Sequence, residues 1–205
     1  VSTMTEQRPI QPTPVGALRF NTDTAKLEYF DGNQYVNITT DSPEQHTGGT
    51  RGLFNLSRDG SNNTINIIDF ITISTTGNAV DFGDETKTHK YCTGSGSRTR
   101  AIWSGSYNPA TSDNISFNTF ASQGNSSDFG DMSYNGRFCT SASNQTRSVN
   151  YAGGNPSAVN TMDFITIAQT GNAIDFGDAT ITVTYPAGCG SPTRGIFSGG
   201  YTPSA

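Results

Sequence analysis

The sequence has few charged residues and no long apolar run, and each shortage excludes a class of protein. Asp, Glu, Lys and Arg make up 14% of the 205 residues, and the formal net charge is −5. Because phosphate binding relies on clustered Lys and Arg, nucleic acid is not an expected partner. No apolar run approaches the roughly 20 residues of a membrane helix, so membrane insertion is not expected.

Metal-binding and redox-active side chains are also scarce. The only histidines are His46 and His89, and the three cysteines, Cys92, Cys139 and Cys189, are spaced by 47 and 50 residues. An odd number of regularly spaced thiols predicts small buried packing residues at equivalent positions, in place of a disulfide framework or a CxxC metal site. We therefore expect no metal and no cofactor.

What the sequence does contain is glycine and an internal repetition. The 23 glycines, with abundant Ser, Thr and Asn, indicate a turn-rich, all-β chain. An Asp-Phe-Gly triplet begins at Asp81, Asp128 and Asp175, at steps of 47 residues. A protein kinase has one such triplet, together with a glycine-rich loop, a strand lysine and a His-Arg-Asp loop that are absent here. Recurrence every 20 to 50 residues or so instead indicates a solenoid, a propeller or an array.

Each repeat has the content of a four-stranded unit. A Thr-Arg pair opens a first strand, a longer strand ends at a Gly-Asn turn, and the Asp-Phe-Gly-Asp and Cys-containing segments supply two more. Four short strands in about 47 residues are typical of a β-propeller blade, and the double glycines Gly153-Gly154 and Gly199-Gly200 at the end of a first strand favour a kelch-like blade. We expect kelch-like β-propeller repeats over 49–205, with three full units and the start of a fourth. Such a chain would not close a propeller by itself, so we expect either an ordered fragment of a longer protein or a homo-oligomer in which the last strand completes a blade of a neighbour.

The N-terminal part predicts a separate small module. We interpret 1–13 as an extended arm, 14–40 as a β-meander attachment motif and 41–48 as a polar linker. In "GALRFNTDTAKLEYFDGNQYVNI", short strand-like runs are separated by an Asn-Thr-Asp-Thr turn and an Asp-Gly turn. A module of this size buries too little surface to stand alone, so we expect it to pack on a partner.

This segment resembles a short β motif of many tailed-bacteriophage virion proteins, especially tail fibres. In that motif a Gly-x-x-Arg-Tyr/Phe-Asn-Thr run precedes an aromatic-Asp-Gly-x-x-Trp/Val strand, and Tyr35 stands here where tryptophan is usual. The segments "TRGIFSGGYTPSA" and "TGNAIDFGD" also resemble repeats in virion proteins of cyanobacterial phages. The resemblances imply a structural virion component, assembled in the host bacterial cytoplasm and held by other virion proteins through the arm and β motif. A tail fibre or appendage is the first placement, and a capsid-surface fibre or decoration protein is the second.

The residues that repeat are expected to be structural. An identical aromatic every 47 residues suits a core layer shared by neighbouring blades. The arginines and paired aspartates suit an inter-strand ion pair in every blade, and calcium at the aspartates is the alternative. The residues concerned are Phe70, Phe117, Phe164, Arg51, Arg100, Arg147, Arg194, Asp81, Asp84, Asp128, Asp131, Asp175 and Asp178.

The rival function is a glycan-binding or glycan-cleaving β-propeller that acts in host receptor recognition. Its sugar-stacking aromatics would be Trp103, Tyr107, Tyr151 and Tyr201. Catalysis is not expected, because no pair of carboxylates is singled out for glycoside hydrolysis and no Gly-x-Ser-x-Gly elbow presents a nucleophile. The expectation is a non-enzymatic protein, with a host surface glycan as the partner in the rival case.

Overall fold

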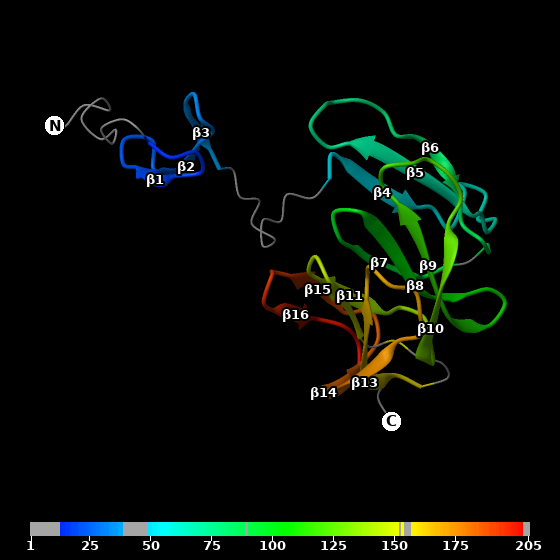
Figure 1. The fold of residues 1–205 in the computed structure, drawn as a ribbon. Helices are drawn as coiled ribbons and strands as arrows, with labels where there is room; N and C mark the ends of the chain where they lie inside the picture. The colour runs from blue at the N-terminus through cyan, green and yellow to red at the C-terminus, as the bar shows by residue number, and fades with distance from the viewer. Residues whose placement is uncertain (1–12, 39–48, 89, 152, 154–156, 203–205) are drawn as a thin grey trace. The chain divides into compact units, whose positions relative to one another are not determined.

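The structure, a computed structural model, describes residues 13–38, 49–88, 90–151, 153 and 157–202. In these residues strands are the only regular secondary structure, which confirms the all-β prediction. The chain divides into two compact units, Val1–Gln45 and His46–Ala205 (Figure 1). Nearly all of the predicted arm, the whole predicted linker with His46, and His89 lie outside the described residues.

The first unit contains one three-stranded antiparallel sheet, in the order β1-β2-β3. Its strands are β1 (Leu18–Asn21), β2 (Lys26–Phe30) and β3 (Tyr35–Asn37). The turn between β2 and β3 forms because Asp31 accepts hydrogen bonds from the backbone N–H groups of Asn33 and Gln34, both at 2.8 Å. The same bonds, that from Gln34 first, hold the pKa of the Asp31 carboxyl below its ordinary value.

The two faces of this sheet differ in chemistry. On one face Arg19 forms an ion pair with Glu28 at 2.6 Å, and its guanidinium lies 3.8 Å from the centre of the Tyr35 ring. The other face is apolar and exposed, since alternation along β1 and β2 places every second side chain there. It consists of two cross-strand pairs, Leu18 with Tyr29 and Phe20 with Leu27, whose exposed fractions are 64% and 39%, and 60% and 42%.

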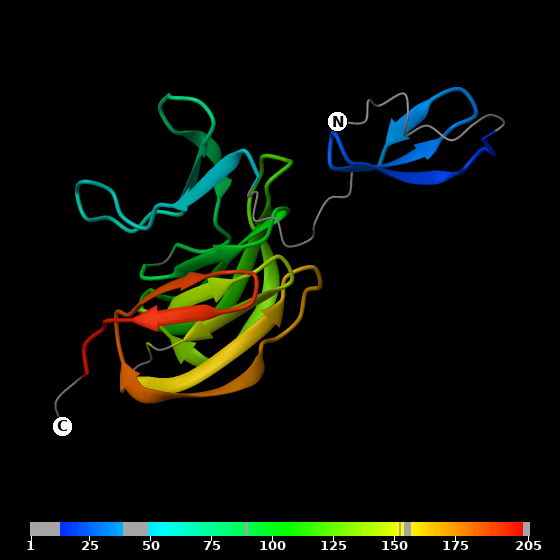
Figure 2. The ribbon, with the colours of Figure 1, turned by 90° about the vertical axis from the view of Figure 1, so that its left-hand side faces the viewer.

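The described residues of the second unit form four antiparallel sheets, and in each the strands pair in chain order. Sheet I has β4 (Arg51–Asn55), β5 (Ile67–Thr72) and β6 (Val80–Asp84). Sheet II has β7 (Thr93–Gly96), β8 (Arg100–Tyr107), β9 (Thr111–Thr119) and β10 (Ser127–Gly136). Sheet III has β11 (Thr140–Ser143), β12 (Arg147–Tyr151), β13 (Val159–Thr166) and β14 (Ile174–Val183), and sheet IV has β15 (Ala187–Gly190) and β16 (Gly195–Ser198). Sheets I to IV follow one another through the unit (Figures 1 and 2).

The Asp-Phe-Gly triplets form β-bulges. In sheet I, Gly83 pairs with Ile68 and Asp81 with Asp69, so Phe82 is an extra residue without a partner. Phe129 and Phe176 stand in the same place in sheets II and III. A bulge turns the extra side chain away from the alternation of the strand, and Phe82 and Phe129 are 3% and 2% exposed. The triplet that resembles a kinase motif therefore aims a phenylalanine at the neighbouring sheet.

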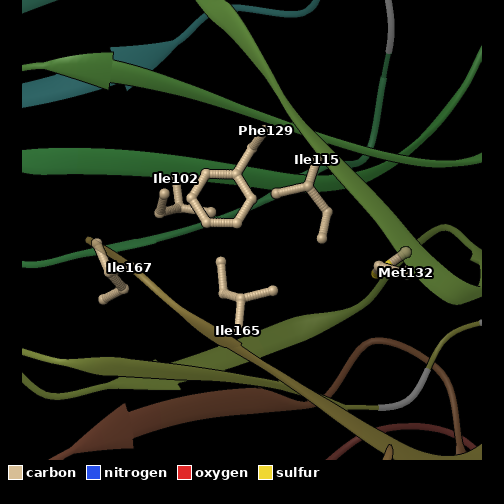
Figure 3. Close-up of a cluster of buried hydrophobic side chains, with 6 residues drawn as sticks. All are labelled: Ile102, Ile115, Phe129, Met132, Ile165 and Ile167. Atoms are coloured by element: carbon tan, nitrogen blue, oxygen red, sulfur yellow. The ribbon is translucent and has the colours of Figure 1, made fainter. Parts of the chain in front are cut away.

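Three hydrophobic clusters join successive sheets. Between sheets I and II lie Ile68, Phe82, Ala101 and Trp103. Between sheets II and III lie Ile102, Ile115, Phe129, Met132, Ile165 and Ile167, and Figure 3 shows Ile165 and Ile167 opposite Ile102, Ile115 and Phe129. A smaller cluster of Tyr151 and Val183 lies at sheet IV. The repeated Phe70, Phe117 and Phe164 are half-buried and make edge contacts of 5.8, 5.9 and 6.1 Å with Phe82, Phe129 and Phe176.

Candidate interaction surfaces

The Thr-Arg arginines connect one sheet to the next. Nη1 of Arg51 donates to the backbone oxygen of Phe120 at 2.6 Å, and Nη1 of Arg100 donates to that of Ile167 at 2.8 Å. Each guanidinium also lies over the phenylalanine of its own sheet, at 4.5 Å from the ring centre for Arg100 and Phe117. The arginine thus stacks within one sheet and hydrogen-bonds to the following one.

The expected pairing of these arginines with the repeated aspartates is wrong. The acceptors of Arg51 and Arg100 are backbone carbonyls of the next sheet. The bulge explains the difference, because it turns the phenylalanine inward and leaves the flanking carboxylates toward solvent. Five of the six aspartates are exposed, and Asp84 is half-buried; the exposed ones are Asp81, Asp128, Asp131, Asp175 and Asp178.

The Gly-Asn turns form hydrogen bonds to the bulge of the preceding sheet. The N–H of Gly171 donates to the oxygen of Phe129 at 2.8 Å, and the N–H of Ala173 donates to that of Asp131 at 2.7 Å. The side-chain oxygen of Asn172 accepts from the N–H of Asp131 at 3.2 Å. Sheets I and II are joined in the same way by Gly124, Asn125 and Ser126 acting on Phe82 and Asp84.

Two buried carboxylates also belong to these contacts, and neither stood out in the sequence. Glu85, which is 2% exposed, accepts from the hydroxyl of Ser126 at 2.7 Å. Asp163, in sheet III, accepts from the N–H and the hydroxyl of Ser133 in sheet II, at 2.7 and 2.8 Å. Within the described ranges no group of three or more His, Cys, Asp or Glu side chains could hold a metal ion.

The cysteines do not all occupy equivalent positions, so that prediction is wrong for one of them. Cys92 and Cys139 precede the first strands of sheets II and III, and burial raises the pKa of each thiol to about 12. One step of 47 residues beyond Cys139 stands Pro186, whereas Cys189 lies within β15 and is exposed. All three are free thiols.

Two of the four aromatics proposed for sugar contact are buried, so their assignment is wrong. Trp103 is 7% exposed, and its Nε1 donates to Asn118 at 2.8 Å. Tyr151 is 4% exposed, and its hydroxyl donates to the oxygen of Ile181 at 2.9 Å. Trp103 lies in the hydrophobic cluster between sheets I and II, and Tyr151 lies in the cluster at sheet IV. Tyr107 is half-buried, whereas Tyr201 is 59% exposed.

A column of stacked aromatic rings lies on the surface of the second unit. Tyr107, Tyr91, Phe138 and Tyr185 follow one another with ring-centre distances of 6.5, 4.3 and 4.0 Å. The last three are spaced by 47 residues, and each has a positive φ, of 64°, 59° and 59°. The sequence shows this repeat as an aromatic residue every 47 residues. Aligning the units on their cysteines hides it, because Cys189 does not directly follow Tyr185 as Cys92 and Cys139 follow Tyr91 and Phe138.

No family model matches this chain, and no curated protein matches it either. In the part of the chain that the structure describes, no helix is long and apolar enough to cross a membrane.

Proposed function

We propose that this chain is a non-enzymatic structural component of a tailed-phage virion. In this proposal the second unit is a kelch-like β-propeller domain for display, and the first unit attaches it to the particle. A tail fibre or appendage, or a fibre or decoration protein of the capsid surface, would use this arrangement.

The observation that carries the proposal is that the repeated arginines, the Gly-Asn turns and the buried Asp163 are used in contacts between sheets. Arg100, Asn172 and Asp163 all make hydrogen bonds to a neighbouring sheet. Side chains committed in this way are not available for a reaction centre, and a surface built from them is a scaffold. A structural role therefore fits these residues better than catalysis does.

Close packing of the first strands of successive sheets supports the propeller. The hydroxyl of Ser141 donates to the oxygen of Gly94 at 2.9 Å, and that of Ser143 to the oxygen of Gly96 at 2.9 Å. A Cβ atom added at Gly188 would lie 2.7 Å from the oxygen of Ser141, so only glycine fits there. Blades of a propeller approach most closely at their inner strands, which is where small residues are needed.

The apolar face of the first unit supports the attachment role. Leu18 and Phe20 are 64% and 60% exposed on a sheet of only three strands. An exposed face of clustered large apolar side chains marks an interaction site. Another virion protein would cover it.

The proposal is tested on particles of a phage that encodes the chain. Mass spectrometry of gradient-purified virions should find the chain in many copies per particle. The double variant Leu18→Asp, Phe20→Asp should be lost from the virions, whereas Val80→Asp, at a 56% exposed position of the second unit, should remain. A chain found only in the soluble lysate and absent from purified particles would refute the virion assignment.

Glycan binding is a second candidate, because the aromatic column ends in an exposed ring. Tyr185 is 60% exposed, and stacking of a sugar on such a ring is the usual mode of carbohydrate recognition by aromatics. Titration with oligosaccharides from the host envelope should give saturable binding that Tyr185→Ala removes. Binding that survives this substitution would exclude the column as the site.

A further inference from the structure

The two outer faces of the second unit expose side chains that are buried wherever two sheets meet. Between sheets II and III, Phe129 and Ile167 are 2% and 1% exposed (Figure 3). The residue equivalent to Phe129 on sheet III is Phe176, which is 48% exposed. The residue equivalent to Ile167 on sheet I is Ile73, which is 63% exposed. One end therefore lacks an inserted isoleucine, and the other end offers one.

The hydrogen-bonding groups at the two faces are complementary in the same way. On sheet III, the guanidinium of Arg147 lies 4.2 Å from the Phe164 ring centre and has no acceptor among the described residues. Its equivalent, Arg100, donates to Ile167. On sheet I, the turn of Gly77 and Asn78 is equivalent to the turns that hydrogen-bond to a bulge elsewhere, but it makes no such hydrogen bond within the described chain.

The space around the glycines at the bulges also shows that sheet III has no neighbouring sheet in this position. A Cβ atom added at Gly130 would lie 2.5 Å from the oxygen of Gly171, because the following sheet is in place. A Cβ atom added at Gly177, the equivalent position on sheet III, would meet nothing within 4 Å.

Strand β16 has a free edge beside this face. Among the described residues it pairs with β15 alone, in a two-stranded sheet, and an unpaired edge is a template for a further strand. Its segment "TRGIF", from Thr193, differs at one residue from "TRGLF", from Thr50, which includes β4. In sheet I that segment pairs with β5, so β16 has the sequence to pair with β5 as well.

A cleft lies between sheets III and IV at this place. Its volume is about 400 Å³, and its lining includes Arg147, Val149, Met162, Phe176 and Phe197. The lining also contains Arg194 and polar residues of the loops before β12 and β16. Its apolar residues and Arg147 match what Ile165, Ile167 and their strand meet on sheet II.

We propose that a second copy of this chain fills this cleft with its β5–β6 hairpin. In the complex, β16 replaces the second copy's β4 on the edge of β5, so the pairing of β4 with β5 seen in one copy is exchanged for that of β16 with β5. The second copy's Ile73 then lies against Phe176, and the backbone oxygen of that Ile73 accepts a hydrogen bond from Arg147. The second copy's Gly77–Asn78 turn hydrogen-bonds to the bulge at Phe176. Each contact repeats one that the chain already makes twice within itself.

Two copies together have enough strands for a closed ring of sheets. With β16 in place of β4, strands β5 to β16 supply three four-stranded sheets per copy. Two copies supply six such sheets, a number within the roughly four to eight blades of known propellers. We therefore assign a closed pair with two identical junctions. This pairing is independent of the virion assignment.

Sedimentation equilibrium and native mass spectrometry test the pair. The chain should have twice its monomer mass of 21.8 kDa. Ile73→Asp and Phe176→Asp should each give monomers, since both place a charge in both junctions. Val80→Asp and Ile174→Asp are matched controls, at 56% and 61% exposed, and should stay paired. Their equivalent in sheet II, Ser127, is exposed although a neighbouring sheet is present.

Mixing the two monomeric variants tests the head-to-tail geometry. An Ile73→Asp copy retains Phe176, and a Phe176→Asp copy retains Ile73, so the mixture should form a heterodimer with one intact junction. Circular dichroism of each variant should match that of the parent chain, because both side chains are exposed in one copy. A monomeric parent chain, variants that stay paired, or a mixture without heterodimer would overturn the proposal, and so would assemblies larger than two copies.

Discussion

Replacing Gly130 by alanine is expected to destabilise the second unit by about 2 to 6 kcal/mol, through two separable costs. Gly130 has a φ of +144°, where an L side chain is strained by about 1 to 3 kcal/mol. The added Cβ would also lie 2.5 Å from the oxygen of Gly171, which is backbone and cannot swing away. Relieving that clash separates the turn from the bulge and weakens the 2.8 Å bond to Phe129, at a further cost of about 1 to 3 kcal/mol.

A matched variant isolates the second cost. Gly177 has the same place in sheet III and a φ of +122°, but its Cβ would meet nothing within 4 Å. Gly177→Ala should therefore show the strain alone, about 1 to 3 kcal/mol. Urea denaturation of both variants, made in the monomeric Ile73→Asp background, gives the two free energies of unfolding. If Gly130→Ala proved no more destabilising than Gly177→Ala, close packing of turn against bulge would be refuted.

Three further predictions concern the arginines and the thiols. Arg100→Ala should lower the free energy of unfolding by about 1 to 3 kcal/mol, because it removes both a hydrogen bond and ring stacking. Arg147→Ala, in a monomeric background, removes the ring stacking alone and should lower it by less than about 1 kcal/mol. Equal losses would contradict the hydrogen bond assigned to Arg100. In the folded chain the exposed Cys189 should react with a thiol reagent faster than the half-buried Cys92 and Cys139, whose raised pKa leaves less reactive thiolate, and labelling of all three at one rate would contradict this order. The folded pKa of Cys92 and Cys139, about 12, exceeds the ordinary thiol value of about 8.5. The stability that these neutral thiols contribute to the folded chain is therefore present below pH 8.5 and should be lost as the pH rises toward 12. Replacing both thiols by alanine should make this loss of stability smaller.

Much of the second unit could be predicted from the sequence, because its strands recur at a fixed step. The Thr-Arg strand, the long strand and the Asp-Phe-Gly strand pair in chain order in sheets I, II and III. The bulge was hidden because it depends on register: only the pairing of Asp81 and Gly83 with β5 shows that Phe82 is an extra residue. Its consequence, an outward carboxylate, is why the arginine–aspartate pairing was expected wrongly.

The contacts that join the sheets were less predictable, since their acceptors are backbone atoms. Arg100 donates to the oxygen of Ile167, and an oxygen common to every residue leaves no trace in the sequence. Glu85 and Asp163 were indistinguishable from exposed acids, because their burial follows from the sheets around them. The aromatic positions Trp103 and Tyr151 were misassigned for the same reason.

A crystal structure of the chain, at a resolution that shows backbone carbonyls, tests most directly the claim that the repeated residues connect successive sheets. The account predicts the guanidinium of Arg100 on the oxygen of Ile167, near the 2.8 Å found here, with Phe129 as the extra residue of a bulge gripped by Gly171. An Arg100 paired with Asp128 or Asp131, or a regular β10 without the bulge, would contradict it.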